Sequence, residues 1–143
     1  MNTPVERFKR FFKNEKSADL SRMDELYRGD IVFRDPVHQI RGLAGLQDYM
    51  ADMYANISEC RFEYLDELVC DGRAYIKWNM HFRHPKMGGK LISVRGVTHI
   101  HFDERIYFHE DIYDMGELLY EHLPILGGAT RWLKHRLAHR KSK

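Results

Sequence analysis

The stretch Ile31-Val32-Phe33-Arg34-Asp35-Pro36-Val37 indicates a short apolar strand that ends at a carboxylate. Proline has no backbone N–H and cannot continue the ladder of a sheet, so Pro36 places the end of the strand at Asp35. An aspartate before a proline has two interpretations. It can shape a turn by binding nearby backbone amides, or it can act as a general base at the mouth of a pocket.

The composition indicates one globular domain with nearly balanced charge. The chain has 143 residues, of which 43% are hydrophobic and 13% aromatic, enough to form a packed core. Its formal net charge of +2 argues against a nucleic-acid-binding protein. Residues 1–7 lack the apolar segment of an export signal, and no apolar run approaches the roughly 18 residues that span a membrane.

Two cysteines, Cys60 and Cys70, are present. If one straight strand carries both, they lie about 33 Å apart, which is too far for a disulfide bond. A reduced, cytoplasmic protein is therefore expected.

Apolar periodicity predicts three helices in the N-terminal part. A capping box formed by Thr3 and Glu6 opens the first, which is expected to run to about Asn14. A second helix opens at Ser17 and ends at Gly29-Asp30. After a loop, the third helix is expected to bury one face, made of Leu43, Leu46, Met50, Met53, Tyr54 and Ile57.

From about Ser58 the hydrophobic pattern has a period of two, which predicts long antiparallel strands. They are expected over residues 60–69, 75–84, 91–103 and 106–113. Helices followed by such strands indicate an α+β fold with the helices on one face of the sheet.

The last part of the sequence is predicted to be helical, with a break at Pro124 between residues 116–123 and 125–137. The second segment combines apolar and basic side chains. It is expected to pack on the domain through Leu126, Trp132, Leu133 and Leu137. The alternative is that this helix lies on an anionic membrane surface.

The order of these elements over residues 3–115 resembles that of the nuclear transport factor 2-like (SnoaL-like) superfamily. The most specific resemblance is Asp35-Pro36-Val37 followed by Arg41-Gly42 and the helix. Bacterial ketosteroid isomerases carry a similar Asp-Pro-Val segment, in which the aspartate shuttles protons. The segment Glu110-Asp111-Ile112-Tyr113-Asp114 is similar to a motif that commonly ends the last strand in uncharacterised members.

This resemblance implies a cone-shaped (cystatin-like) curved sheet that wraps around the N-terminal helices, with a pocket at its open end. Residues 1–115 would form the domain and 116–143 a basic helical extension of it. The superfamily includes isomerases, polyketide cyclases, dehydratases and noncatalytic binding or assembly domains, so the fold leaves the function open.

The sequence departs from the ketosteroid isomerases at their oxyanion donors. The tyrosine of the first helix corresponds to Phe11 or Phe12, and the protonated aspartate of the third long strand to Thr98 or His99. Phenylalanine donates no hydrogen bond, so steroid isomerisation is not expected. Base chemistry by Asp35 is compatible with this departure.

Alternation along the strands predicts one apolar face, which packs as core or lines a pocket for an apolar or aromatic molecule. Asp35 is the predicted base, with Asp111, Tyr113 or His99 as a second polar group. A β-bulge in the last strand would reverse its alternation, so the face occupied by Asp111 and Tyr113 stays open. The residues predicted to bind the ligand are Phe11, Phe33, Tyr54, Trp78, Met80, Thr98 and Phe108.

The other face of the strands is polar and rich in histidine. His99 and His101 point the same way and could bind a metal ion as a pair. A wet interface between two copies of the chain suits such a face better, so a homodimer through the sheet is predicted and a metal site is not. The chain has no glycine-rich phosphate loop, and no cofactor is predicted.

Two functions remain as hypotheses. In the first, the domain is an enzyme, such as an isomerase, cyclase or dehydratase, that moves protons on a small apolar substrate. In the second, it is a noncatalytic ligand-binding or dimeric assembly domain, attached to a membrane surface through its basic C-terminal helix.

Overall fold

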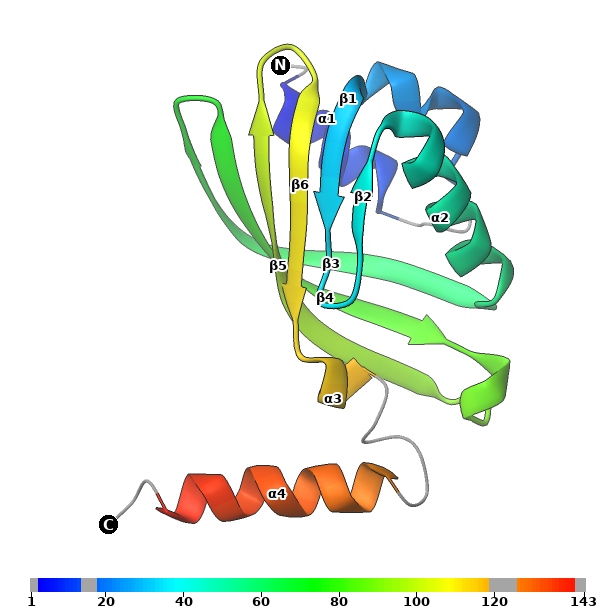
Figure 1. The fold of residues 1–143 in the computed structure, drawn as a ribbon, viewed down its shortest axis with the longest axis vertical. Helices are drawn as coiled ribbons and strands as arrows, with labels where there is room; N and C mark the ends of the chain where they lie inside the picture. Colours follow the sequence, from blue (N-terminus) through cyan, green and yellow to red (C-terminus); the bar gives the residue numbers. More distant parts are fainter. Residues whose placement is uncertain (1–2, 14–17, 119–125, 141–143) are drawn as a thin grey trace.

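The computed structural model contains one curved sheet that wraps around the N-terminal helices (Figure 1), as expected for the cone fold. It describes residues 3–13, 18–118 and 126–140. The helices are α1 (Pro4–Phe11), the 3-10 helix η2 (Leu20–Glu25), α2 (Leu43–Ala55), the 3-10 helix η3 (Pro85–Met87), α3 (Met115–Leu118) and α4 (Leu126–Arg140). The strands are β1 (Tyr27–Arg34), β2 (Gln39–Arg41), β3 (Glu59–Cys70), β4 (Arg73–Arg83), β5 (Leu91–Phe102) and β6 (Ile106–Tyr113).

The strand order is β2-β1-β6-β5-β4-β3, and every neighbouring pair is antiparallel except β1 and β6, which run parallel. Phe33 lies opposite His109 in this parallel pair, and Arg34 lies opposite Glu110. Residues that follow β1 and residues at the end of β6 therefore lie at the same end of the sheet. This topology brings Asp35 and Asp111 together.

The capping box of the first helix is confirmed. The Glu6 amide donates to Thr3 Oγ1 at 3.2 Å, and the Thr3 amide donates to a Glu6 carboxylate oxygen at 3.4 Å. The helix ends at Phe11, earlier than expected, while Asn14 and Ser17 lie outside the described residues.

The predicted end of the second helix is wrong. This element is the short helix η2, and Gly29-Asp30 lie inside β1. The reason is pairing with β6, because the Ile106 amide donates to the Leu26 carbonyl at 2.9 Å and Tyr27 begins the parallel ladder. Part of the predicted loop before α2 is likewise the strand β2, which forms a hairpin with β1.

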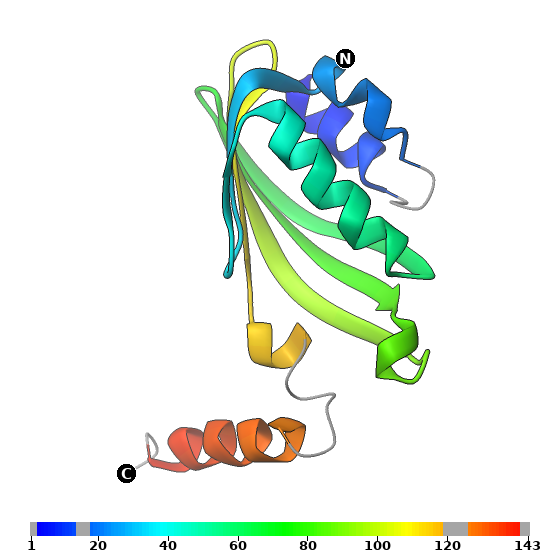
Figure 2. The same cartoon turned by 45° about the vertical axis from the view of Figure 1, so that its right-hand side comes forward.

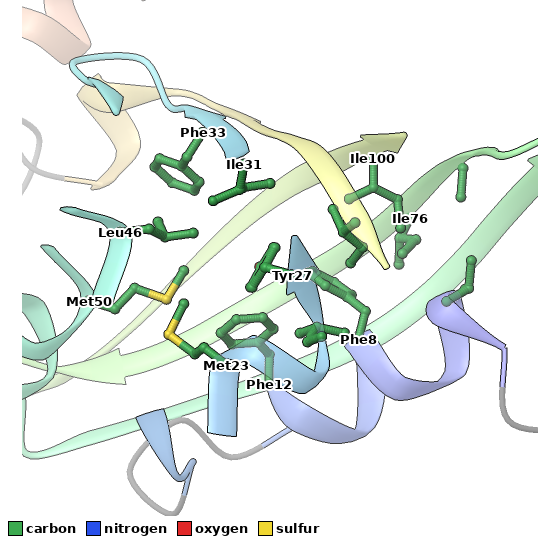
Figure 3. Close-up of a cluster of buried hydrophobic side chains, with 14 of the residues drawn as sticks. Phe8, Phe12, Met23, Tyr27, Ile31, Phe33, Leu46, Met50, Ile76 and Ile100 are labelled. Atoms are coloured by element: carbon green, nitrogen blue, oxygen red, sulfur yellow. The ribbon is translucent and has the colours of Figure 1, made fainter. Parts of the chain in front are cut away.

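The core lies between the sheet and the helices α1, η2 and α2 (Figure 3). Figure 2 shows these helices on the concave side of the sheet. The largest side chains that are almost fully buried include Tyr27, Phe33, Met23, Ile31, Leu46, Ile76 and Ile100. Cys60 is buried and Cys70 is exposed, and no disulfide bond joins them, as expected from their predicted separation.

A bulge reverses the alternation of β6. Phe102 pairs with Ile106, but the next pair along the ladder is His101 with Phe108, which leaves Tyr107 as an extra residue. Ile106 and His109 are both buried, so the inward positions after the bulge are 109, 111 and 113. The orientation predicted for Phe108 was the reverse, and that prediction is wrong.

The predicted packing of the last helix on the domain is also wrong. Trp132, Leu133 and Leu137 of α4 are 57%, 54% and 58% exposed. Figures 1 and 2 show α4 beyond the open end of the cone, away from the sheet. An ion pair of 2.6 Å joins Lys134 Nζ to Asp114 Oδ2 at the end of β6.

α3 begins at Met115, one residue before the predicted start of this helical segment, and the Gly116 amide donates to Asp114 Oδ1 at 2.8 Å. Residues 119–125, which include Pro124 and part of the predicted helix 116–123, lie outside the described residues. Among the described helices, none is long and apolar enough to cross a membrane.

Candidate functional site

A cavity of about 350 Å³ opens between the C-terminal end of α2, the beginning of β3, the end of β4 and the ends of β1 and β6. This size is near the lower end of the range for small-molecule sites. The lining is largely aromatic and aliphatic. It consists of Phe33, Asp35, Met53, Tyr54, Asn56, Ile57, Cys60, Phe62, Trp78, Met80, Phe82, His84, Asp111 and Tyr113.

Asp35 both shapes a turn and faces the cavity. Its Oδ1 accepts hydrogen bonds from the amides of Val37 at 2.9 Å and His38 at 2.7 Å. Its side chain is nevertheless only 4% exposed. The Asp35 amide also donates to the His38 carbonyl at 3.0 Å, which closes the hairpin between β1 and β2. The turn therefore holds the carboxylate in one orientation toward the cavity.

The Tyr49 hydroxyl donates a hydrogen bond to Asp35 Oδ2. Tyr49 lies on α2, and its ring packs against Phe33 with 5.6 Å between the ring centroids. Burial raises the pKa of the Tyr49 phenol, and the hydrogen bond and charge of Asp35 raise it further. Tyr49 therefore remains a donor, and it orients the second carboxylate oxygen.

Asp111, which lies next to Asp35 because β1 and β6 are neighbouring strands, belongs to a chain of buried polar groups. Its Oδ1 is 2.7 Å from His109 Nε2, and His109 Nδ1 is 2.7 Å from the Tyr27 hydroxyl. The His109 side chain is 3% exposed, and the rings of Phe8, Phe12 and Phe33 pack around it. Because an ionised carboxylate only accepts, Nε2 carries the proton of the His109–Asp111 hydrogen bond.

Thr98 and Trp78 complete this chain. The Thr98 hydroxyl donates to Asp111 Oδ1 at 2.6 Å, and the Trp78 indole N–H donates to Thr98 Oγ1 at 2.8 Å. Asp111 Oδ1 therefore receives two hydrogen bonds that fix its position. Among the described residues, no hydrogen bond reaches Asp111 Oδ2.

Tyr113 places a phenol in the same cavity. Burial raises the pKa of this phenol, and the charges of Asp35 and then Asp111 raise it further. Both carboxylates are therefore close enough to affect the Tyr113 hydroxyl. No side chain of the described part of the chain forms a hydrogen bond with that hydroxyl, which leaves it able to donate to a bound molecule.

The structure brings together most of the residues predicted for the site. Asp35, Asp111 and Tyr113 share the cavity, and Phe33, Tyr54, Trp78 and Met80 line it. Thr98 lies just inside, where it borders a void of about 40 Å³ beside His109 and Asp111.

Three predicted residues lie elsewhere. Phe11 borders a separate open groove with Arg7 and Arg10, because α1 covers the other end of the core. Phe108 lies on the outer face of the sheet, because the bulge turns it outward. His99 is also on the outer face, where its ring stacks on Tyr75 with 4.2 Å between the centroids.

The paired histidines form a hydrogen bond, with 3.1 Å between His99 Nε2 and His101 Nε2. Burial lowers the pKa of both imidazoles, and His101 and Arg73 respectively lower them further. Within the described ranges, no group of three or more His, Cys, Asp or Glu side chains could hold a metal ion.

Sequence reasoning missed two residues of the site, Tyr49 and His109. Tyr49 follows Leu46 by three positions and precedes Met53 by four, so it adjoins the predicted buried face of α2. His109 alternates with Asp111 and Tyr113, which gives a polar inward series once a bulge is assumed. Both signals were present, but neither specified a role.

A family model for the SnoaL-like domain matches residues 8–109, a range that contains Asp35 and ends before Asp111. No curated protein matches this sequence significantly.

Solved structures have the same fold at low sequence identity. One is a protein of ketosteroid isomerase-like fold from Catenulispora acidiphila in complex with trimethylamine, 14% identical, with a TM-score of 0.71 over 82% of this chain and 92% of that one. A candidate SnoaL-like polyketide cyclase from Shewanella putrefaciens is 19% identical, with a TM-score of 0.69 over 82% and 94% of the two chains.

TerC, co-crystallised with polyporic acid, is 14% identical, with a TM-score of 0.66 over 78% of this chain and 91% of that chain. These structures establish the fold, and the family model covers most of the sequence. The chain belongs to the SnoaL-like domain family.

Proposed function

We propose that the cavity is an active site in which Asp35 removes a proton from a small, largely apolar substrate, as in isomerisation, cyclisation or dehydration. The observation that carries this proposal is the shared cavity: the buried carboxylate of Asp35 faces the same space as Asp111 and Tyr113. A base and a hydrogen-bond donor that face the same bound molecule can together move a proton at carbon.

The hydrogen bonds of Asp35 leave it one free acceptor position. An ionised carboxylate has about four lone-pair sites. Two on Oδ1 receive the amides of Val37 and His38, and one on Oδ2 receives Tyr49. The remaining site on Oδ2 can take the proton of the substrate. Three fixed donors also prevent the carboxylate from rotating during the reaction.

Tyr113 is the best hydrogen-bond donor that the cavity offers to the substrate. Its raised pKa keeps the hydroxyl protonated, so it can donate to an oxygen that becomes negative as Asp35 takes the proton. Asp111 is held in place by Thr98 and His109, and His109 Nδ1 in turn accepts from the Tyr27 hydroxyl. This arrangement supplies a hydrogen-bond donor without the tyrosine of the ketosteroid isomerases.

The bound molecules of similar structures support a small-molecule role. Trimethylamine and polyporic acid are the compounds named for two of them. The aromatic lining would exclude water and hold an apolar group by contact with Trp78, Phe62 and Tyr54.

Proton removal can be tested with 5-nitrobenzisoxazole, a neutral compound that requires no cofactor. A base takes its carbon-bound proton, the N–O bond breaks, and the electron pair of that bond leaves on oxygen as a coloured phenolate. Asp35→Asn is expected to lower kcat/KM at least about 100-fold, and Tyr113→Phe about 10-fold.

Asp71→Asn is the matched control. Asp71 lies in the turn between β3 and β4, at the opposite end of these strands from the cavity, and its left-handed backbone suits asparagine. This variant should react like the wild type. The proposal is wrong if the wild type is no faster than acetate at equal concentration, or if Asp35→Asn retains activity within about twofold.

A second function rests on α4. Its exposed Trp132, Leu133 and Leu137 lie among basic residues, and all 21 acidic residues of the chain precede residue 126. A helix with exposed apolar and cationic side chains can lie on an anionic membrane surface. In this candidate function, α4 places the domain at such a surface.

A further inference from the structure

We propose that the natural ligand of the cavity is a small organic cation, an ammonium or iminium compound with apolar substituents. This inference rests on the proposed function in one respect, because both assign the same cavity. It adds a charge to the substrate class, which an apolar lining alone would leave neutral.

The first argument is the charge of the lining. Two carboxylates, Asp35 and Asp111, face the cavity, and its lining contains no lysine or arginine. The one histidine of the lining is His84, whose Nδ1 accepts the Lys86 amide at 3.0 Å. In this hydrogen bond His84 is an acceptor, so its Nδ1 offers no N–H to an anion. The lining is therefore anionic.

The second argument concerns the partners of the carboxylates outside the lining. Asp111 contacts His109, and a positive charge on His109 would balance the negative charge of Asp111. Asp35 has His38 Nδ1 at 3.4 Å from its Oδ1, but the His38 side chain is half exposed and lies on the solvent side. The other donors to Asp35 are neutral amides and the Tyr49 phenol. Even with His109 charged, the cavity retains the negative charge of Asp35.

The third argument is the aromatic lining. Six aromatic side chains line the cavity, together with the thioethers of Met53 and Met80. The faces of aromatic rings carry partial negative charge and attract ammonium groups, most strongly where water is excluded. Aromatic faces and nearby carboxylates together recognise a compact cation whose substituents are apolar. A neutral molecule of the same shape would lack the attraction between a positive charge and the two carboxylates.

The same features disfavour an anion. A carboxylate or phosphate in the cavity would lose hydration and face Asp35 and Asp111 without any lysine or arginine to pair with. The expected order of affinity is therefore cation, then neutral molecule, then anion, for compounds of equal shape.

The test compares two compounds of almost identical shape, choline and 3,3-dimethylbutan-1-ol, which differ in having nitrogen or carbon at the branched centre. Benzyltrimethylammonium and benzenesulfonate extend the comparison to a larger cation and an anion. Binding is measured at pH 8, where an ordinary imidazole is neutral, through the fluorescence of Trp78 in a Trp132→Phe background. Trp78 and Trp132 are the two tryptophans of the chain, and Trp132 is exposed.

Choline is expected to bind at least about tenfold more tightly than the alcohol, and benzyltrimethylammonium more tightly than benzenesulfonate. Asp35→Asn and Asp111→Asn should each reduce the preference for choline at least about threefold, and Asp71→Asn should leave it unchanged. Equal or tighter binding of the alcohol overturns the inference, and so does the absence of binding by both cations. The comparison in the wild type is decisive even if a variant folds poorly.

The two proposals can fail separately. If 5-nitrobenzisoxazole reacts through Asp35 but cations show no preference, the active site stands and the substrate class is wrong. If cations bind selectively and Asp35→Asn does not slow proton removal, the cavity is a noncatalytic cation-binding site.

Discussion

Gly96 leaves the space that the Trp78 indole occupies. The two residues lie opposite each other in the ladder between β4 and β5. A Cβ atom at Gly96 would lie 2.7 and 2.8 Å from Trp78 Cζ2 and Cζ3, and closer still to Cη2. The indole is held by its hydrogen bond to Thr98 and by the rings of Phe62 and Tyr113 around it. Because residue 96 has no side chain, the Trp78 indole can occupy this position and line the cavity.

Gly96→Ala is expected to destabilise the protein by about 1–3 kcal/mol, because the added methyl group must displace the packed indole. The variant should also shift the Trp78 fluorescence and weaken binding in the cavity. Thermal unfolding and fluorescence spectra measure both effects. Gly29→Ala is the control, since its Cβ would meet no atom within 4 Å. Equal stability of the two variants would show that the Trp78 indole can move aside without lowering the free energy of unfolding.

Asp35 illustrates how far single residues could be predicted. The apolar run and Pro36 correctly predict a strand end with a carboxylate, and that carboxylate both forms the turn and lines the cavity. Its action as a base stays a prediction. Tyr49 could not be assigned, because its role depends on how α2 lies against β1. That angle is set by packing across the core and has no local signal in the sequence.

At the scale of elements, the bulge in β6 decides the composition of the site. Strict alternation would place Phe108 inside and His109, Asp111 and Tyr113 outside, and one extra residue at Tyr107 reverses all four. Strands β4 and β5 have no such irregularity, and there alternation correctly predicts the buried face. The position of a bulge depends on the pairing of two strands, so the sequence of β6 alone leaves it open.

The bulge also places Phe108 beside His99 and His101 on the outer face of the sheet, at 5.6 and 5.0 Å between ring centroids. The pKa values of His99 and His101 lie below the ordinary 6.5, and burial is the largest cause. The unfolded chain therefore takes up protons at a higher pH than the folded one. The contribution of the two histidines to the free energy of unfolding is therefore complete above about pH 6.5, and it is lost as the pH drops below that value.

His99→Gln combined with His101→Gln should reduce the loss of thermal stability between pH 7.5 and 5.5, because the variant no longer has to keep two imidazoles uncharged. Melting temperatures of both proteins at each pH measure this. His81→Gln, on the same face beside Glu63, is the control and should keep the pH dependence of the wild type. An unchanged slope in the double variant would contradict a role of the pair.

At the scale of the whole molecule, the α+β cone was predictable because long segments of regular periodicity determine it. The helices and long strands form near the expected positions. The parallel pairing of β1 with β6 joins segments about 75 residues apart and could be inferred only through the family resemblance. That pairing creates the cavity, since it brings Asp35 to Asp111. The fold was thus more predictable than the site.

The charge of the molecule is divided between its parts. Residues 126–143 contain three arginines, three lysines and no acidic residue, while the rest of the chain has 21 acidic and 17 basic residues. The acidic part would be repelled by an anionic membrane, and α4 would be attracted. The ion pair of Lys134 with Asp114 is one contact between α4 and the rest of the chain. A surface ion pair contributes about 1 kcal/mol or less, so binding of α4 to a membrane could break it.

Replacement of Trp132, Leu133 and Leu137 by alanine is therefore expected to abolish binding to vesicles of phosphatidylglycerol and phosphatidylcholine. The melting temperature should change by no more than about 2 °C, because these side chains are more than half exposed. Sedimentation with vesicles measures binding, and binding by the wild type should weaken with added salt and vanish with phosphatidylcholine alone. Leu68→Ala, which removes a side chain that is 74% exposed on β3, is the control and should bind as the wild type does.

A large loss of melting temperature in the triple variant would mean instead that α4 packs on the domain, and failure of the wild type to bind anionic vesicles would exclude the membrane function.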